Sequence, residues 1–114
     1  MLTLDQVGEL LDAELLCGDN LSVRVDRVGA ADLMSDVLAL STPGMLLLTG
    51  LMNAQVIRTA HVADLSGVVF VRGKRPNEEI LALARKVQIP VLSTSLNMFE
   101  AVGRLYSALG SPGR

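Results

Sequence analysis

The sequence predicts a single α/β domain whose small, mostly parallel sheet is flanked by helices. Three apolar runs, residues 45–48, 68–71 and 91–92, are each followed by a segment with helical periodicity. These runs are apolar on both faces, which is typical of parallel strands covered by helices. With 114 residues, the chain has the usual length of one domain. We expect that domain over residues 1–109 and a disordered tail rich in Gly, Ser and Pro over residues 110–114.

The first forty residues predict a meander of short elements attached to this α/β half. The motif Thr-Leu-Asp-Gln at residues 3–6 fits a capping box for a helix over residues 4–12. A brief strand at residues 15–17 follows, and residues 22–28 alternate as a half-buried strand at a sheet edge. Residues 32–40 have helical spacing, but their secondary structure stays ambiguous.

The remaining chain alternates strand and helix, and an asparagine precedes each predicted helix. Asn53, Asn77 and Asn97 are suitable N-cap residues because their side chains can accept a hydrogen bond from the first turn. The predicted inward-facing residues are Val56, Ile57, Ala60 and Ala63 in the first helix, Ile80, Leu83, Ala84 and Val87 in the second, and Met98, Val102, Leu105, Tyr106 and Leu109 in the third. Strand–helix–strand units of this kind predict right-handed crossovers.

The composition restricts the class of partner. The formal net charge is −2, whereas a duplex nucleic-acid binder usually has a basic footprint, so we expect no nucleic-acid partner. Charged residues make up 19% of the chain, below the roughly 25% of an ordinary soluble domain. This low fraction favours an apolar surface that meets a second copy, as in a homodimer, over a compact monomer.

The cysteine content and the apolar runs indicate the compartment. Cys17 is the only cysteine, so the chain has no internal disulfide, and we expect a cytoplasmic protein. The segment MLTLDQVGELL contains acidic residues and no basic region, which argues against a signal peptide. No apolar run approaches the roughly 20 residues of a membrane helix, so we expect no membrane association.

Three loops are predicted to meet at the carboxyl edge of the sheet, where ligands bind in open α/β folds. These loops are residues 49–53, 72–77 and 93–97, and each leads into a helix N-terminus that favours an anion. The predicted ligand-binding residues are Thr49, Gly50, Asn53, Arg72, Gly73, Lys74, Arg75, Ser93, Thr94 and Ser95. A nucleotide or phosphate would suit this set. The alternative is that these residues only cap helices and form solvated loops.

The basic stretch VRGKRP does not fit a nucleotide-hydrolysing P-loop. That motif has four residues between its glycines, followed by Lys and Ser or Thr. Here five residues separate Gly67 from Gly73, and Arg75 stands where the hydroxyl residue belongs. A GxGxxG dinucleotide turn is absent as well. A phosphotransfer site is therefore not expected. The sequence shows no other constellation of side chains typical of catalysis, so we expect no catalytic residues, no cofactor and no enzymatic activity.

The isolated reactive side chains have simple structural explanations. His61, the only histidine, is predicted on a helix surface, and one histidine does not make a typical structural zinc site, so we expect no metal. Cys17 is expected to be a small buried hydrophobe. Asp32 and Asp36 have helical spacing, and a solvated helix face accounts for them.

Residues 18–109 resemble the DRTGG domain, which is similar to the N-terminal domain of bacterial HPr kinase/phosphorylase. The resemblance is carried by the Pro43-Gly44 turn, by Thr49-Gly50, by Ala-Asp-Leu-Ser-Gly at residues 63–67 and by Ile-Pro-Val-Leu-Ser-Thr at residues 89–94. The P-loop half of HPr kinase has no counterpart in this sequence.

The resemblance implies a non-catalytic regulatory or sensor module. Such domains accompany phosphotransacetylases, CBS-pair proteins and pyrophosphatases, where the combined region binds adenine nucleotides. The resemblance therefore implies an adenine nucleotide or another small anion as ligand. Small single-domain relatives occur beside genes for iron-only hydrogenases and similar redox proteins. The alternative it implies is a protein-interaction module for a redox- or hydrogenase-related partner, with no ligand.

Overall fold

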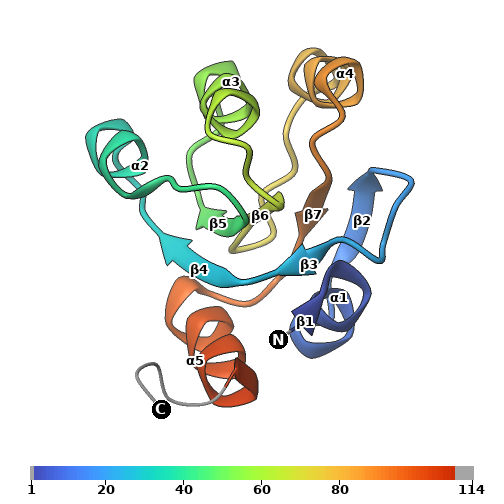
Figure 1. Ribbon diagram of the computed structural model, residues 1–114, viewed down its shortest axis with the longest axis vertical. Coiled ribbons are helices and arrows are strands. Elements are labelled where there is room, and N and C mark those ends of the chain that lie inside the picture. The colour runs from blue at the N-terminus through green and yellow to red at the C-terminus, as the bar shows by residue number, and fades with distance from the viewer. Residues whose placement is uncertain (1, 110–114) are drawn as a thin grey trace.

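A five-stranded sheet forms the centre of the molecule, with helices on both faces (Figure 1). The computed structural model describes residues 2–109. The elements in chain order are β1 (Leu2–Thr3), α1 (Leu4–Leu11), β2 (Glu14–Cys17), β3 (Arg24–Val25), β4 (Arg27–Ala30), α2 (Met34–Leu40), β5 (Met45–Thr49), α3 (Ala54–Val62), β6 (Gly67–Phe70), α4 (Glu78–Val87), β7 (Val91–Ser93) and α5 (Met98–Leu109). The strand order is β2-β7-β6-β5-β4, and only β2 runs antiparallel to its neighbour. The predicted α/β fold with a mostly parallel sheet is confirmed.

Each connection between neighbouring parallel strands contains one helix. The helices α2, α3 and α4 lie together on one face of the sheet, and α1 and α5 cover the other face (Figure 1). Three successive crossovers of one hand place their helices on one face in this way. The other face is left for the two terminal helices, which gives a three-layer molecule.

Alternation along β5 divides the core into two clusters. Met45 and Leu47 pack with the apolar residues of α2, α3 and α4, whereas Leu46 and Leu48 pack with those of α1 and α5. All four side chains are buried. Because successive side chains of a strand point to opposite faces, one continuous apolar run supplies both clusters.

The N-terminal region is part of the main sheet, contrary to the prediction of an attached meander. β2 pairs with β7 at one edge, and β4 pairs with β5 at the other. The single strand predicted over residues 22–28 is also wrong, because the chain breaks at Asp26. β3 pairs with β1 in a separate two-stranded sheet, while β4 joins the main sheet. The two halves of this segment therefore pair with strands of two different sheets.

The predicted capping box is present at α1. The side chain of Thr3 accepts a hydrogen bond from the backbone N–H of Gln6, and the Gln6 side chain accepts one from the N–H of Thr3. In contrast, α2 begins after Leu33 without any side-chain cap. The missing cap explains why the sequence left residues 32–40 ambiguous, since the cap is the main local signal for a helix start.

The predicted inner faces of the later helices are correct with one clear exception. Ile57 and Ile80 are buried as expected, and so is Leu105. Tyr106, predicted to face inward, is 53% exposed, and the fully buried Ala101 occupies the inner face instead. The small side chain at residue 101 lets α5 lie closer to the sheet than an aromatic ring would. The tail predicted over residues 110–114 lies outside the described residues.

Candidate functional site

The three predicted loops lie side by side at the carboxyl edge of the sheet. The register pairs Thr49 with Phe70 and Phe70 with Ser93, so the parallel strands end at one level. Backbone hydrogen bonds then tie the loops together: the N–H of Arg72 donates to the carbonyl of Leu96 at 2.8 Å. The N–H of Gly73 donates to the carbonyl of Thr94, also at 2.8 Å. The predicted convergence of these loops is therefore present in the structure.

The hydroxyl groups at this edge are engaged by the chain itself. The Thr94 hydroxyl donates to the carbonyl of Leu11 at 2.6 Å, and that of Ser93 donates to the carbonyl of Lys74 at 2.7 Å. The Thr49 hydroxyl accepts from the N–H of residue 51 at 3.0 Å. All three residues are buried, whereas Ser95 is exposed. These bonds indicate that the buried hydroxyls hold the loops in shape, while Ser95 can reach solvent.

The helix N-termini at this edge differ in charge. Asn53 caps α3 by accepting from the N–H of Val56 at 3.2 Å, and the first turn of α3 contains no acidic residue. Glu78 and Glu79 occupy the first turn of α4, and Glu100 that of α5. Because a carboxylate in the first turn already satisfies the positive end of a helix, α3 is the helix that best favours an external anion.

The loop at residues 72–77 contains three basic side chains, of which one forms an ion pair with another described residue and two do not. Arg75 forms a two-pronged ion pair with Glu14, with nitrogen–oxygen distances of 2.6 and 3.2 Å. The guanidinium of Arg75 lowers the pKa of the Glu14 carboxyl below its ordinary value. Within residues 2–109, the side chains of Arg72 and Lys74 have no hydrogen bond or ion pair, and both are exposed. These two cations are therefore available to a ligand.

Arg72 reaches from its own loop to the neighbouring loop at Gly50. A β-carbon at Gly50 would collide with a guanidinium nitrogen of Arg72, so the close approach depends on glycine. Arg72 and Gly73 both have positive φ angles, 62° and 70°, which bend the loop back over the strand ends. The geometry explains why Arg72 lies beside the loop that leads into α3.

A carboxylate that the sequence did not predict at this edge also contacts Gly50. The N–H of Gly50 donates to Oδ1 of Asp32 at 2.7 Å. The sequence suggested only a solvated helix face for Asp32, because no local pattern relates it to a glycine 18 residues away. Asp32 thus places an internal anion beside Arg72, on an amide that an external anion could otherwise use.

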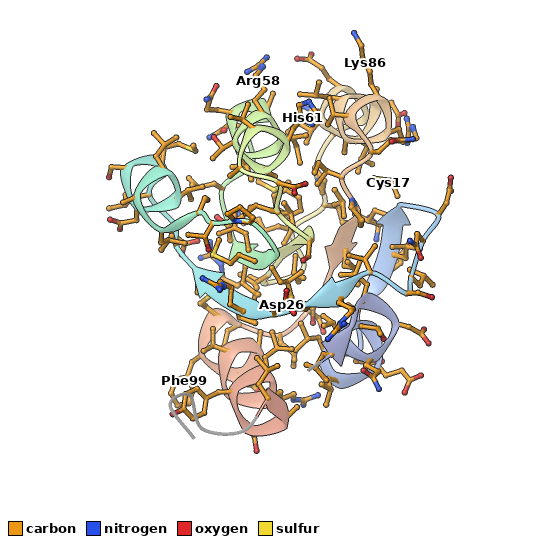
Figure 2. All side chains as sticks on the ribbon, viewed as in Figure 1. Cys17, Asp26, Arg58, His61, Lys86 and Phe99 are labelled. Atoms are coloured by element: carbon orange, nitrogen blue, oxygen red, sulfur yellow. The ribbon has the colours of Figure 1, made fainter. Side chains whose placement is uncertain are left out.

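Among the described residues, the depression at the opposite edge of the sheet, Cys17 and His61 show no comparable group of charged side chains and helix N-termini. A depression of about 780 Å³ at the opposite edge of the sheet is lined by residues that include Cys17, Asp64 and Pro90. The Cys17 thiol donates to the carbonyl of Ile89 at 3.3 Å, and burial raises its pKa, so it is the predicted buried hydrophobe. His61 is exposed on α3, as predicted (Figure 2).

Across residues 2–109, no three acidic, His or Cys side chains are grouped closely enough to hold a metal ion. In the same part of the chain, no helix has the length and apolar character that crossing a membrane requires.

The fold defines a class of protein: small three-layer α/β domains built from repeated strand–helix units. The chain belongs to the DRTGG domain family, whose family model matches residues 6–108. The resemblance seen in the sequence is thereby confirmed.

One solved structure illustrates the likeness. It contains the CBS and DRTGG domains of the regulatory region of Clostridium perfringens pyrophosphatase, complexed with the activator diadenosine tetraphosphate. The match has a TM-score of 0.69 at 21% sequence identity and covers 90% of this chain. It covers 45% of the pyrophosphatase chain, so this chain spans about half the length of that neighbour. At this identity the likeness establishes the shared fold.

Proposed function

We propose that this chain is a non-catalytic regulatory module that binds a small phosphate-bearing anion, with an adenine nucleotide as the first candidate. The site is the carboxyl edge around Gly50, Arg72, Lys74 and the N-terminus of α3. The observation that carries the proposal is the exposed guanidinium of Arg72, which lies over Gly50 without an ion pair among the described residues.

The electrostatics of the edge support an anion as the ligand. Arg72 can form two parallel hydrogen bonds to a phosphate, and Lys74 adds a second positive charge from the same loop. The first turn of α3 supplies backbone N–H groups that no acidic side chain of that turn competes for. Because Arg72 and Lys74 are exposed, salt will screen their attraction, and we expect weak binding, with a dissociation constant of about 0.1–1 mM.

The first loop also supports a ligand with an apolar part, as in a nucleotide. Leu51 and Met52 follow Gly50 directly, and both are only partly buried. A phosphate group on Arg72 would place the rest of the ligand against these two side chains. Recognition would then combine a charged contact with an apolar one, as most small-molecule sites do. The pyrophosphatase regulatory region crystallised with an adenine nucleotide activator supports this choice.

Calorimetric titration with AMP, ADP, ATP and inorganic phosphate tests the proposal. We expect binding of at least one nucleotide and a loss of about tenfold or more in affinity for Arg72→Ala. Lys86→Ala is the matched control because Lys86 is an exposed cation in the last turn of α4, at the far end of that helix from the site. It should bind as the wild type does.

A blank result would count against the proposal. Neither heat nor a thermal shift at millimolar nucleotide would leave the edge as a set of solvated loops. The alternative reading, an interaction module for a redox- or hydrogenase-related protein, would then be the better hypothesis. Equal losses of affinity for Arg72→Ala and Lys86→Ala would indicate non-specific charge attraction and no defined site.

A further inference from the structure

The outer face of α5 exposes two of the three aromatic side chains of the chain. Phe99 is 87% exposed and Tyr106 is 53% exposed. Figure 2 shows Phe99 at the periphery of the molecule, beside α5. The two residues are seven positions apart, so they lie on one flank of the helix, two turns from each other. Exposed aromatic rings at such spacing are typical of a surface that another protein covers.

A shallow hollow runs next to these rings. Its volume is about 560 Å³, and residues lining it include Phe99, Gly103, Ser107 and Ala108. A β-carbon added at Gly103 would have no atom within 4 Å apart from its chain neighbours and the backbone of its own helix. Gly103, Ser107 and Ala108 contribute small side chains and exposed helix backbone to this lining, beside the larger side chains of Leu10, Glu100 and Arg104. The small residues allow a second helix to approach closely at this point.

The opposite flank of the same face contains one acid and one base. Glu100 and Arg104 are four positions apart, and both are exposed. Arg104 also donates from one nitrogen to the carbonyl of Leu10 at 3.1 Å, which fixes its position and leaves further N–H groups for a partner. The midpoint of Phe99 and Tyr106 and the midpoint of Glu100 and Arg104 both fall on the helix turn at residues 102–103.

We propose that α5 is the interface of a two-fold homodimer, in which the α5 helices of two copies cross antiparallel near Gly103. A two-fold axis that lies between the helices and perpendicular to them keeps each flank on its own side and reverses the chain direction. Phe99 of one copy then meets Tyr106 of the other, and Glu100 of one copy meets Arg104 of the other. Each contact occurs twice by symmetry.

The charge pattern identifies the occupant as a second copy of this chain. An unrelated helix would need its own acid, base and aromatic residues at matching positions, whereas α5 supplies all of them to itself. The inner face of α5, with Ala101 and Leu105, is fully buried against the rest of the domain. Apart from the hydrogen bond that Arg104 donates to the Leu10 carbonyl, changes on the outer face should therefore alter association and leave the fold intact.

Sedimentation velocity over a range of protein concentrations tests the interface. We expect the wild type to dimerise at micromolar concentrations and Gly103→Arg to stay monomeric, with an unchanged circular dichroism spectrum. The control is Val62→Arg, because Val62 is 85% exposed on α3, on the other face of the molecule (Figure 1). That variant should dimerise as the wild type does. A monomeric wild type, or a Gly103→Arg variant that dimerises normally, would overturn the proposal.

A charge exchange tests the pairing itself. Glu100→Arg places two bases opposite each other at both contacts, and Arg104→Glu places two acids there, so each variant alone should weaken dimerisation by about tenfold or more. An equimolar mixture of the two variants restores an acid–base pair at both contacts. We expect heterodimers in that mixture by native mass spectrometry. If the mixture associates no better than either variant alone, the antiparallel pairing is wrong.

Discussion

Asp32 is an acidic side chain at the edge where we propose that an anion binds. Its carboxylate accepts the Gly50 N–H and lies beside Arg72, so it opposes an incoming phosphate by charge and by occupying the amide. We expect Asp32→Asn to tighten nucleotide binding by about threefold to tenfold, because the variant removes the charge and keeps the shape. Calorimetry at low salt would measure the change.

The matched control for this prediction is Asp36→Asn, which removes the same charge from an exposed position in the first turn of α2. Its affinity should equal that of the wild type. Weaker binding by Asp32→Asn would mean that the carboxylate positions the ligand or holds a cation, contrary to the proposed anion site.

A second residue-scale prediction concerns Glu14 and Arg75. The pKa of Glu14 in the folded protein lies below its ordinary value of 4.5, because Arg75 donates to its carboxylate. The pair therefore stabilises the fold at neutral pH, and its contribution disappears as the pH falls through the lowered pKa. Since both side chains are more than half exposed, the effect is small. Glu14→Gln should lower the melting temperature slightly at pH 7.

The pH series distinguishes this pair from a general charge effect. The difference in melting temperature between wild type and Glu14→Gln should shrink as the pH falls below about 4.5. Glu9→Gln serves as the control, because Glu9 is an exposed acid in α1 with no ion pair among the described residues. Its melting temperature should stay close to that of the wild type across the pH series. A gap between wild type and Glu14→Gln that stays constant down to acidic pH would contradict the assignment.

At the scale of elements, a buried hydroxyl joins β7 to α1. Thr94 donates to the carbonyl of Leu11, the last residue of α1, and accepts from the N–H of Leu96 at 3.2 Å. Thr94→Val has nearly the same shape but leaves both backbone groups without this partner. We expect a loss of about 1–3 kcal/mol in the free energy of unfolding, measured by urea denaturation.

Thr94→Ser separates the hydroxyl from the methyl group of this side chain. It keeps both hydrogen bonds and removes one buried methyl, so its loss should be smaller than that of Thr94→Val. A larger loss for Thr94→Ser than for Thr94→Val would show that packing of the methyl group stabilises this junction more than the hydrogen bonds do. The result bears on the site as well, because the Thr94 carbonyl also accepts the N–H of Gly73.

At the scale of the whole molecule, both faces of the sheet depend on β5. Leu47 lies on the interior strand β5 and is fully buried in the apolar cluster that includes residues of α2, α3 and α4. Leu47→Ala should cost about 2–5 kcal/mol, because it removes buried apolar atoms and leaves a cavity. We expect the urea midpoint to fall with no change in the slope of the transition, as for one cooperative unit.

The control for this prediction makes the same chemical change at the surface. Leu38 is 59% exposed on α2, and Leu38→Ala should alter the free energy of unfolding by about 0.5 kcal/mol or less. Comparable losses for the two variants would contradict the assignment of Leu47 to a tightly packed core.

The layered fold also separates the two proposed surfaces. The proposed ligand contacts lie at the strand ends next to α3, whereas the proposed dimer contact is centred on Gly103 of α5, and α3 and α5 cover opposite faces of the sheet (Figure 1). Gly103→Arg should therefore bind nucleotide as the wild type does, and Arg72→Ala should dimerise normally.

The sequence by itself determined the parallel half of the fold and the meeting of the three loops. The apolar runs and the asparagine caps at Asn53, Asn77 and Asn97 depend on neighbours within one or two turns, and such local preferences survive in the structure. Once these strands are parallel, their carboxyl ends must share one edge. The position of the candidate site therefore followed from local patterns.

Only the tertiary structure decided which side chains at that edge are available. The Asp32 carboxylate accepts the N–H of Gly50, and Glu14 forms an ion pair with Arg75, which is 61 residues away. The hydroxyl of Thr94 donates to a carbonyl of α1. The segment at residues 22–28, predicted as one strand, forms two short strands because its two halves pair in different sheets. Such contacts join segments that are distant in the chain, so their formation depends on how whole elements pack, which no short stretch of sequence encodes.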